Sequence, residues 1–229
     1  AQALIDNDSL VKYMQEHFLN QDGELEVITN NEPAIYDDPN LFEETVTLTR
    51  GDEDIDYTLY HYVSEEGLYD QPERVDRANV KYKGFKLDGE VFDRNDYGLW
   101  VDLFGGVISG WSYGITHFKS GEKTDLGDGT FSYSDTGKGI LFIPSGLAYI
   151  NSGNADILPN ESIIFYIELN EVFYVDHDED TVYSRFEDIN EDGKYSDDDT
   201  DDDGIPNYID DDDDGDGVLT KDEDADGDG

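Results

Sequence analysis

The sequence after Val175 most strongly constrains what this chain can fold into, because aspartate recurs there with a period of about 12 residues. Three windows, which begin at Asp188, Asp199 and Asp212, place oxygen-bearing side chains at positions 1, 3 and 5, glycine at position 6 and a carboxylate at position 12. A segment with so many like charges and so few apolar residues cannot build an ordinary hydrophobic core. It therefore either stays solvated or folds around bound cations.

These windows have the spacing of calcium-binding loops, in which oxygen ligands occupy positions 1, 3, 5, 7, 9 and 12 and the chain turns sharply at position 6. A weaker window runs from Asp176 to Glu187, with Thr181 in the glycine position, and a further one begins at Asp224 and is cut off at Gly229. Position 9 is held by Ser196, Asn207 and Thr220 in the three stronger windows. The other predicted ligands are the side chains of Asp176, Asp178, Asp180, Glu187, Asp188, Asn190, Asp192, Asp199, Asp201, Asp203, Asp210, Asp212, Asp214, Asp216, Glu223, Asp224, Asp226 and Asp228, and the carbonyls of Lys194, Ile205 and Val218.

Calcium is the favoured ion, because the windows supply many flexible oxygen ligands, whereas transition metals prefer His or Cys. The windows lack the long flanking helices of sensor EF-hands, and the segment resembles thrombospondin type 3 repeats more closely. That resemblance implies an extracytoplasmic spacer folded around Ca²⁺, with sites of ~10⁻⁴ to 10⁻³ M that would be empty in a cytosol. The alternative, a solvated acidic tail, does not explain the recurring glycine and the carboxylate at position 12.

Charge limits the partners of the whole chain. Its 229 residues include 58 acidic and 14 basic side chains, for a formal net charge of −44, which excludes nucleic acid and anionic lipid as expected partners. About 25 of the acidic residues follow Val175, so half of the excess belongs to the tail. Cysteine is absent, which fits an exported protein but is weak evidence for one. No stretch approaches the ~20 apolar residues of a membrane span.

The rest of the chain predicts an α+β domain. Asp8 and Ser9 are candidate caps of a helix over residues 10–19, with Leu10, Met14 and Phe18 on one face. Alternating apolar residues predict hairpins around "GDED" and "LDGE" and further strands up to Val175, while "GWSYGITHF" alone is helical in pattern, with Ser109 as its N-cap. We therefore expect an antiparallel sheet wrapped around a short central helix. The expected divisions are a helix-containing N-terminal extension (1–50), this domain (51–175) and the calcium-binding repeats (176–229).

Five blocks in the central part carry a family resemblance. They are "VKYKGFKLDGEVFD" (80–93), "VISGWSYGI" (107–115), "SGEK" (120–123), "FIPSGLAY" (142–149) and "ILPNESIIFYIEL" (157–169). In this order they resemble the FKBP-type peptidyl-prolyl isomerases over about half of the chain. The resemblance implies an FKBP-like fold and activity on proline-containing polypeptides, with no cofactor for the isomerisation.

The resemblance also implies roles for individual residues. It implies that Trp111 forms the floor of a proline pocket and that the Tyr149 hydroxyl reaches the substrate carbonyl. The walls of the pocket are then formed by the other four catalytic positions, Tyr82, Phe92, Asp93 and Phe165. The expected substrate-binding positions are Trp100, Val107, Ile108 and Ile157, with Leu99 or Val101 as alternatives to Trp100. For each of these residues, ordinary core packing is the alternative.

The expected chemistry needs no nucleophile, because rotation of an X-Pro bond breaks no covalent bond. A dry aromatic pocket favours the twisted amide, which is less dipolar than the planar one, and a placed donor stabilises its carbonyl or nitrogen. The four histidines show no metal-binding spacing.

Two departures from the family pattern bear on function. "DLGDGTFSYSDTGKG" predicts an extra β-hairpin and resembles a variant in exported isomerase-like proteins of Bacteroidota. In the loop after Tyr149, Ile150 and Leu158 stand where the family often has Gly and Pro.

We expect an isomerase that assists folding or assembly of exported proteins at the bacterial cell envelope, periplasmic or surface-exposed, associated with the outer membrane and anchored as a lipoprotein. The alternative functions are a non-catalytic interaction subunit of an outer-membrane complex and a calcium-dependent adhesion protein.

Overall fold

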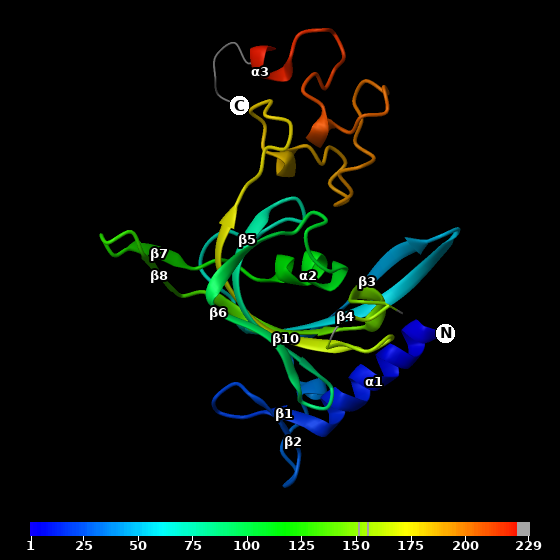
Figure 1. Ribbon diagram of the computed structural model, residues 1–229, viewed down its shortest axis with the longest axis vertical. Helices are drawn as coiled ribbons and strands as arrows, with labels where there is room; N and C mark the ends of the chain where they lie inside the picture. Colours follow the sequence, from blue (N-terminus) through cyan, green and yellow to red (C-terminus); the bar gives the residue numbers. More distant parts are fainter. Residues whose placement is uncertain (151, 155, 224–229) are drawn as a thin grey trace.

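The fold is built on a six-stranded antiparallel sheet, as seen in a computed structural model that describes residues 1–150, 152–154 and 156–223. The strand order is β3-β4-β9-β10-β5-β6, and the sheet curves around the short helix α2 (Figure 1). Its strands are β3 (Leu41–Arg50), β4 (Glu53–Glu65), β5 (Arg77–Lys86), β6 (Val91–Asp102), β9 (Gly137–Ile143) and β10 (Ile163–Phe173). The predicted α+β architecture, an antiparallel sheet wrapped around a short central helix, is confirmed.

Shorter elements surround this sheet. Two small hairpins pair β1 (His17–Leu19) with β2 (Leu25–Val27) and β7 (Glu122–Asp125) with β8 (Phe131–Ser134). The α-helices are α1 (Gln2–Glu16), α2 (Ser109–Gly114) and α3 (Thr220–Glu223). Single 3₁₀ turns are η1 (Ile35–Asp37), η2 (Ile115–His117), η3 (Ser145–Leu147), η4 (Ser184–Phe186) and η5 (Asn207–Ile209).

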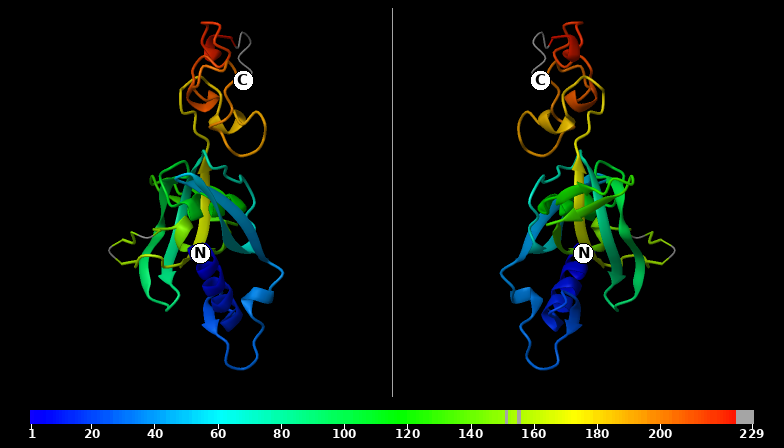
Figure 2. Two further views of the ribbon diagram at one scale, coloured as in Figure 1. Left: turned by 90° about the vertical axis from the view of Figure 1, so that its right-hand side faces the viewer. Right: turned by 90° about the vertical axis from the view of Figure 1, so that its left-hand side faces the viewer.

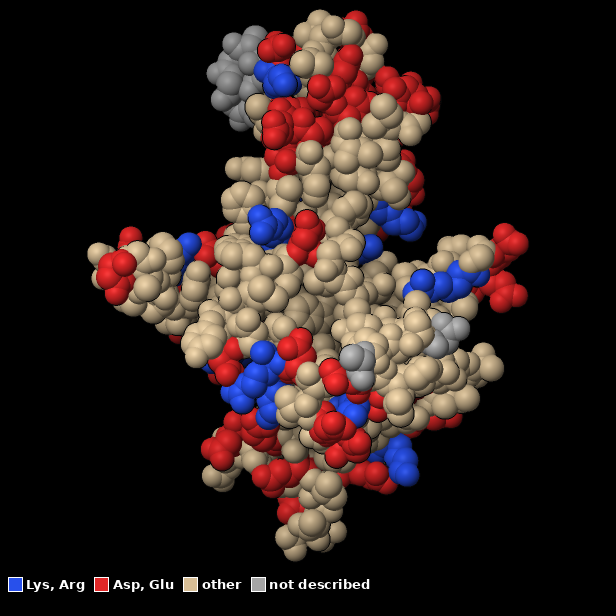
Figure 3. Space-filling view, in the orientation of Figure 1, with Lys and Arg blue, Asp and Glu red and all other residues tan. Residues whose placement is uncertain are grey.

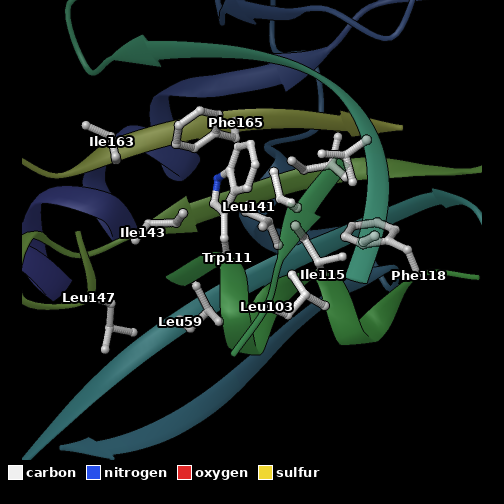
Figure 4. Close-up of a cluster of buried hydrophobic side chains, with 14 of the residues drawn as sticks. Leu59, Leu103, Trp111, Ile115, Phe118, Leu141, Ile143, Leu147, Ile163 and Phe165 are labelled. Carbon is white, nitrogen blue, oxygen red and sulfur yellow. The ribbon is translucent and has the colours of Figure 1, made fainter. Parts of the chain in front are cut away.

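The central strands β9 and β10 carry apolar and aromatic runs, over residues 140–143 and 163–167, because both faces of the sheet are covered there. In β9, Leu141 and Ile143 face α2, whereas Ile140 and Phe142 face the opposite way, toward α1. Successive strand residues point to opposite faces, so a strand buried on both sides contains no polar alternation. Figure 4 shows the α2 side of this core, with Trp111 rising from α2 toward the sheet.

Helix α2 lies close to the sheet because glycine faces β9. A Cβ on Gly110 would collide with the side chain of Ile143, so any larger residue would push the helix outward. Ser109 is the first residue of the helix and not its N-cap, which is Ile108, and no side chain caps this end. The predicted capping by Ser109 is therefore wrong.

Helix α1 covers the other face of the sheet and begins earlier than predicted. Asp8 and Ser9 lie inside the helix and do not cap it, and Phe18 belongs to β1. Leu10 and Met14 are fully buried, as predicted. The earlier start follows from a tertiary contact, because buried Asp6 accepts a 2.6 Å hydrogen bond from the Ser145 hydroxyl of η3.

The hairpins follow the sequence pattern, and one of them crosses an expected domain boundary. Arg50 pairs with Glu53 at the tip of β3–β4, so the whole of β3 belongs to the central sheet. The sheet therefore begins at Leu41, and the expected boundary at residue 50 falls within a hairpin turn. The extra hairpin predicted within residues 125–139 is present as β7–β8, and its first strand begins three residues earlier, at Glu122.

The tail docks on the central domain at the end opposite α1 (Figure 2). Val75 of the domain packs with Tyr195 and Tyr208 of the tail in a small buried cluster. Acidic side chains gather over the tail, whereas the middle of the face in view is mostly uncharged (Figure 3). Within the described part of the chain, no helix has the length and apolar character needed to span a membrane.

Candidate active site and carboxylate loops

A hollow of about 640 Å³ lies between α2, β5, β6 and the segment after η3. Seven of the residues predicted for the proline pocket line it: Tyr82, Asp93, Val107, Ile108, Trp111, Tyr149 and Phe165. They come from β5, β6, β10, the segment around α2 and the segment after η3, and the curvature of the sheet around α2 brings these parts together (Figure 1).

Aromatic rings form the floor and one wall of this pocket. The ring of Trp111 lies edge-to-face against Tyr82, at 4.9 Å between centroids, and against Phe165, at 5.0 Å. Phe92 was also predicted to line the pocket, but it is not among the lining residues and contributes by packing edge-on against Phe165 at 5.5 Å. Edge-to-face pairs add to the stability gained by burial and hold each ring in one orientation. The result is a preformed apolar surface.

A β-bulge places Phe92 and Asp93 beside this surface. The register between β5 and β6 shifts between Gly84, which faces Asp93, and Phe85, which faces Val91, so Phe92 is the extra residue. Asp93 then accepts a 2.9 Å hydrogen bond from the Tyr82 hydroxyl. Burial, followed by this bond and the charge of Asp93, raises the pKa of Tyr82 to about 12. Tyr82 therefore remains a neutral donor at physiological pH.

Two substrate-binding predictions differ from the structure. Trp100 points away from the pocket and packs on Phe173, whereas its neighbours Leu99 and Val101 line the pocket. Strand alternation explains the difference, because residues 99 and 101 share a face that residue 100 cannot share. Ile157 is 1% exposed and belongs to the core, and it is not among the lining residues.

Two further residues shape the pocket without having been predicted. Arg50 lines it, and its guanidinium donates a 3.2 Å hydrogen bond to the Gly146 carbonyl. Gly84 lies behind the aromatic wall, where an added Cβ would sit 2.5 Å from Phe165 and 2.7 Å from Phe92. The long β3–β4 hairpin carries Arg50 to the pocket, a placement that no local pattern indicates.

The pocket contains polar groups that can act on an amide. The indole Nε1 of Trp111 is buried and has no hydrogen-bond partner among the described residues. Tyr149 is half-buried, and burial followed by the charge of Asp93 raises the pKa of its hydroxyl. Both groups are therefore neutral donors available to a ligand in the aromatic pocket.

In the tail, four loops repeat one backbone conformation. We call them loop A (176–187), loop B (188–199), loop C (199–210) and loop D (212–223). The carboxylate at position 1 accepts a hydrogen bond from the amide at position 6 in every loop, at 2.8 to 3.2 Å. The φ angle is positive at position 6 in all four: Thr181 (86°), Gly193 (77°), Gly204 (95°) and Gly217 (89°). Loop A thus adopts the same turn as the others, although Thr replaces Gly.

Carboxylate oxygens converge in three of the four loops. Oxygens at positions 1, 3 and 5 lie within 4.8 Å of one another in loop A (Asp176, Asp178, Asp180), loop C (Asp199, Asp201, Asp203) and loop D (Asp212, Asp214, Asp216). The corresponding residues of loop B are Asp188, Asn190 and Asp192, and Lys194 forms a 3.0 Å ion pair with Asp192. The predicted residues Asp224, Asp226 and Asp228 lie outside the described part of the chain.

The predicted ligands at position 9 have another role in two loops. Asn207 accepts a 2.9 Å hydrogen bond from the Thr200 amide, and Thr220 accepts one of 3.2 Å from the Asp213 amide. These side chains fix the start of their own loops, which sequence spacing does not reveal.

Several carboxylate oxygens of the tail are buried without a hydrogen-bond partner among the described residues. They include Oδ2 of Asp178 and Asp180, Oδ1 of Asp199 and Asp212, and both carboxylate oxygens of Glu187. Burial, followed by the charges of Asp178 and Asp180, raises the pKa of Glu187 to about 8. Buried carboxylates are normally paired or bound to a cation. This set of hard oxygen donors fits calcium, and no His or Cys contributes to the sets of converging ligand atoms in the described chain.

The sequence is similar to FKBP-type peptidyl-prolyl cis-trans isomerases. Residues 69–127 match the family model of FKBP-type peptidyl-prolyl cis-trans isomerases. An FKBP-type peptidyl-prolyl cis-trans isomerase, FkpA of Escherichia coli strain K12, is 35% identical over 117 residues, which are 50% of this chain and 37% of that protein. The probable FkpA of Neisseria meningitidis serogroup B is 32% identical over 114 residues, or 48% and 36% of the two chains. The chain therefore spans little more than a third of these relatives.

Among solved structures, the crystal structure of Escherichia coli FkpA matches 50% of this chain and 47% of its own, with 36% identity and a TM-score of 0.41. A peptidyl-prolyl cis-trans isomerase from Pseudomonas syringae covers 75% of this chain and 92% of its own, with 21% identity and a TM-score of 0.46.

Proposed function

Because the chain carries an FKBP-type domain, we propose that the protein is a peptidyl-prolyl cis-trans isomerase and that the pocket over Trp111 is its active site. The observation that carries this proposal is the packed set of rings from Tyr82, Phe92, Trp111 and Phe165 beside the polar groups of Asp93 and Tyr149. The proposed substrates are proline-containing polypeptides.

The pocket lowers the rotation barrier by the environment it gives the amide. An X-Pro bond rotates over a barrier of ~18 to 20 kcal/mol because rotation interrupts amide resonance. The planar amide is more dipolar than the twisted one, so removal of water by Trp111 and Phe165 destabilises the planar form more. The proline ring occupies the apolar floor, and no covalent intermediate is formed.

Placed donors add a second contribution. The Tyr149 hydroxyl donates to the substrate carbonyl, and the bond from Tyr82 holds Asp93 as a fixed polar group at the rim. Donors that are already oriented stabilise the twisted state without reorganisation. In this role, Asp93 does not transfer a proton.

A proline-peptide isomerisation assay tests the proposal with matched hydroxyl deletions. Tyr82→Phe and Tyr149→Phe should each lower kcat/KM, by about tenfold, which corresponds to the loss of one hydrogen bond. Tyr97→Phe is the control, because Tyr97 is 94% exposed and does not line the pocket. A rate at background in the unmodified protein, unchanged by Phe92→Ala, would contradict catalysis and support the non-catalytic interaction subunit.

We further propose that the tail binds several Ca²⁺ ions and that the protein works outside the cytoplasm. The converging carboxylates of loops A, C and D and their unpartnered buried oxygens support calcium binding. Weak oxygen-ligand sites would fill only where calcium is abundant, which supports an extracytoplasmic location. Calorimetry on the intact chain should detect calcium uptake at millimolar concentration, and uptake of no ion would contradict this proposal.

The proposed cellular role is assistance to the folding or assembly of exported proteins at the cell envelope. Outer-membrane association, a lipid anchor and docking to an outer-membrane complex are parts of this proposal. The ordered contact between tail and domain supports a tail that positions the pocket and is not merely a tether. Fractionation of cells should recover the protein with the envelope, and recovery in the cytosol would contradict the proposed location.

A further inference from the structure

The two ends of the tail meet at one cluster of carboxylates. Oxygens of Asp180 and Glu187 in loop A lie within 4.8 Å of each other and of an oxygen of Asp213 in loop D. Asp213 occupies position 2 of its loop, which is not a ligand position in loops of this spacing. The sequence pattern therefore gives it no role.

Burial makes this cluster different from an ordinary acidic surface. Asp180 is 0% exposed and Glu187 is 2% exposed. One oxygen of Asp180, both of Glu187 and one of Asp213 are buried without a hydrogen-bond partner among the described residues. Three carboxylates that share a buried space repel one another strongly unless a cation lies between them.

The basic side chains near this cluster do not neutralise it. Arg185, two residues before Glu187, forms ion pairs with Glu73 at 2.9 Å and with Asp76 at 3.6 Å on the central domain. Lys221 acts on Asp180 only through its charge, and no ion pair joins them among the described contacts. A bound cation would supply the compensating charge.

Loop A also lacks one ligand of its own. Its position 9 is Ser184, whose hydroxyl lies 2.7 Å from the His177 ring and accepts a 3.2 Å bond from the His177 amide. Ser184 is 0% exposed, and its hydroxyl is engaged by His177. Asp213 is placed on the same side as Glu187 and can supply the missing oxygen, and its backbone is fixed by its bond to Thr220.

We propose that Asp213 of loop D completes a calcium site of loop A, so that one ion joins the first and last loops and closes the tail into a single body. The ligands are Asp180 and Glu187 from loop A and Asp213 from loop D. The inference rests on the proposed calcium binding and adds to it a particular ligand and a structural consequence. Without the ion, repulsion among the three carboxylates separates the two loops.

The experiment compares two substitutions that remove the same charge from neighbouring positions. In the full-length chain, Asp213→Asn should weaken one class of calcium sites by about tenfold or more, because it removes a charged ligand. Asp211→Asn is the matched control, because Asp211 is exposed and belongs to none of the converging sets. Asp213→Glu keeps the carboxylate and should restore binding in part.

A distance measurement tests closure independently of affinity. The chain has no cysteine, so spin labels can be placed at Phe186→Cys and Asp222→Cys, two exposed positions in loops A and D. In the labelled chain without a further substitution, calcium should narrow the distribution of distances between the two labels, and Asp211→Asn should show the same narrowing. With Asp213→Asn, calcium should not narrow this distribution.

The outcomes separate this inference from the function on which it rests. If no variant binds calcium, the proposed calcium binding itself fails. If calcium binds but Asp213→Asn behaves like Asp211→Asn in both measurements, the tail binds calcium and the joined site is wrong. Glu187→Gln provides a second variant in case Asp213→Asn fails to fold, and it should show the same loss of affinity and closure.

Discussion

The Tyr82 hydroxyl donates a 2.9 Å hydrogen bond to Oδ2 of Asp93 at the rim of the aromatic pocket. The contact spans β5 and β6 beside a bulge, and it fixes an acidic group next to rings that exclude water. Hydrogen bonds to a charged acceptor contribute about 1.5 to 3 kcal/mol. The pair is therefore expected to act as one unit in ligand binding.

A double-mutant cycle on this pair measures that coupling. Asp93→Asn and Tyr82→Phe should each reduce kcat/KM by about tenfold, because either change releases the other partner. The double variant should lose little more than either single one. Full additivity of the two losses in the isomerisation assay would show that the residues act separately.

Gly84→Ala should disturb the pocket through its aromatic wall. The added Cβ would lie 2.5 Å from Phe165 and 2.7 Å from Phe92, so both rings must shift. This overpacking should lower the unfolding free energy by about 1 to 3 kcal/mol. Activity should fall with stability. Gly89→Ala is the control, because Gly89 has open space around it but a φ of 86°. It should lower stability in chemical denaturation and leave kcat/KM unchanged.

Thr181→Gly should stabilise loop A. Thr181 has a φ of 86°, a conformation that glycine adopts freely and that strains a β-branched residue by about 1 to 3 kcal/mol. The substitution should raise the melting temperature of the tail and tighten calcium binding severalfold. Gly204→Thr makes the reverse change in loop C and should weaken it. Equal behaviour of the two variants in calorimetry would contradict the role of strain.

His61 should make the central domain less stable in acid. Its ring stacks on His117 at 3.6 Å, and His117 contacts Glu44 at 2.9 Å. Burial, followed by the charge of His117, lowers the pKa of His61 to about 4, from about 6.5 in an unfolded chain. The unfolded chain binds more protons between these values, so the unfolding free energy falls as the pH drops from about 6.5 to about 4.

Chemical denaturation across this pH window tests the role of His61. His61→Phe keeps an aromatic ring against His117 and Phe42 but cannot bind a proton. The variant should show a smaller loss of stability on acidification than the unmodified protein. The same pH slope in both proteins would place the titrating group elsewhere.

Local patterns in the sequence were sufficient for much of the architecture. Alternation predicted the hairpins of β3–β4 and β5–β6 and further strands up to Val175. The FKBP-like blocks predicted seven of the residues that line the pocket. These features depend on residues that lie close together in the sequence, so they can be predicted from the sequence alone.

The errors arose where a distant contact overrode a local signal. Asp8 and Ser9 are good capping residues, yet α1 extends past them because Asp6 is held by Ser145 of η3. Trp100 faces away from the pocket because strand alternation places Leu99 and Val101 on the inward face of β6. Which of these neighbouring residues face inward depends on the pairing of β6 with β5, which spacing along the sequence does not reveal.

The tail shows most clearly which features follow from the sequence and which depend on the tertiary structure. Ligand spacing within 12 residues follows from the sequence alone, because each loop folds around its own backbone, with position 1 bonded to position 6. Which loops lie together was decided only by the tertiary structure, which brings Asp213 to Glu187 and Val75 to Tyr195. The physical reason is the distance along the sequence over which each interaction acts. Turn geometry and ligand order are set by residues within one loop, whereas burial and the repulsion between carboxylates of different loops arise only when the folded chain brings distant segments into contact.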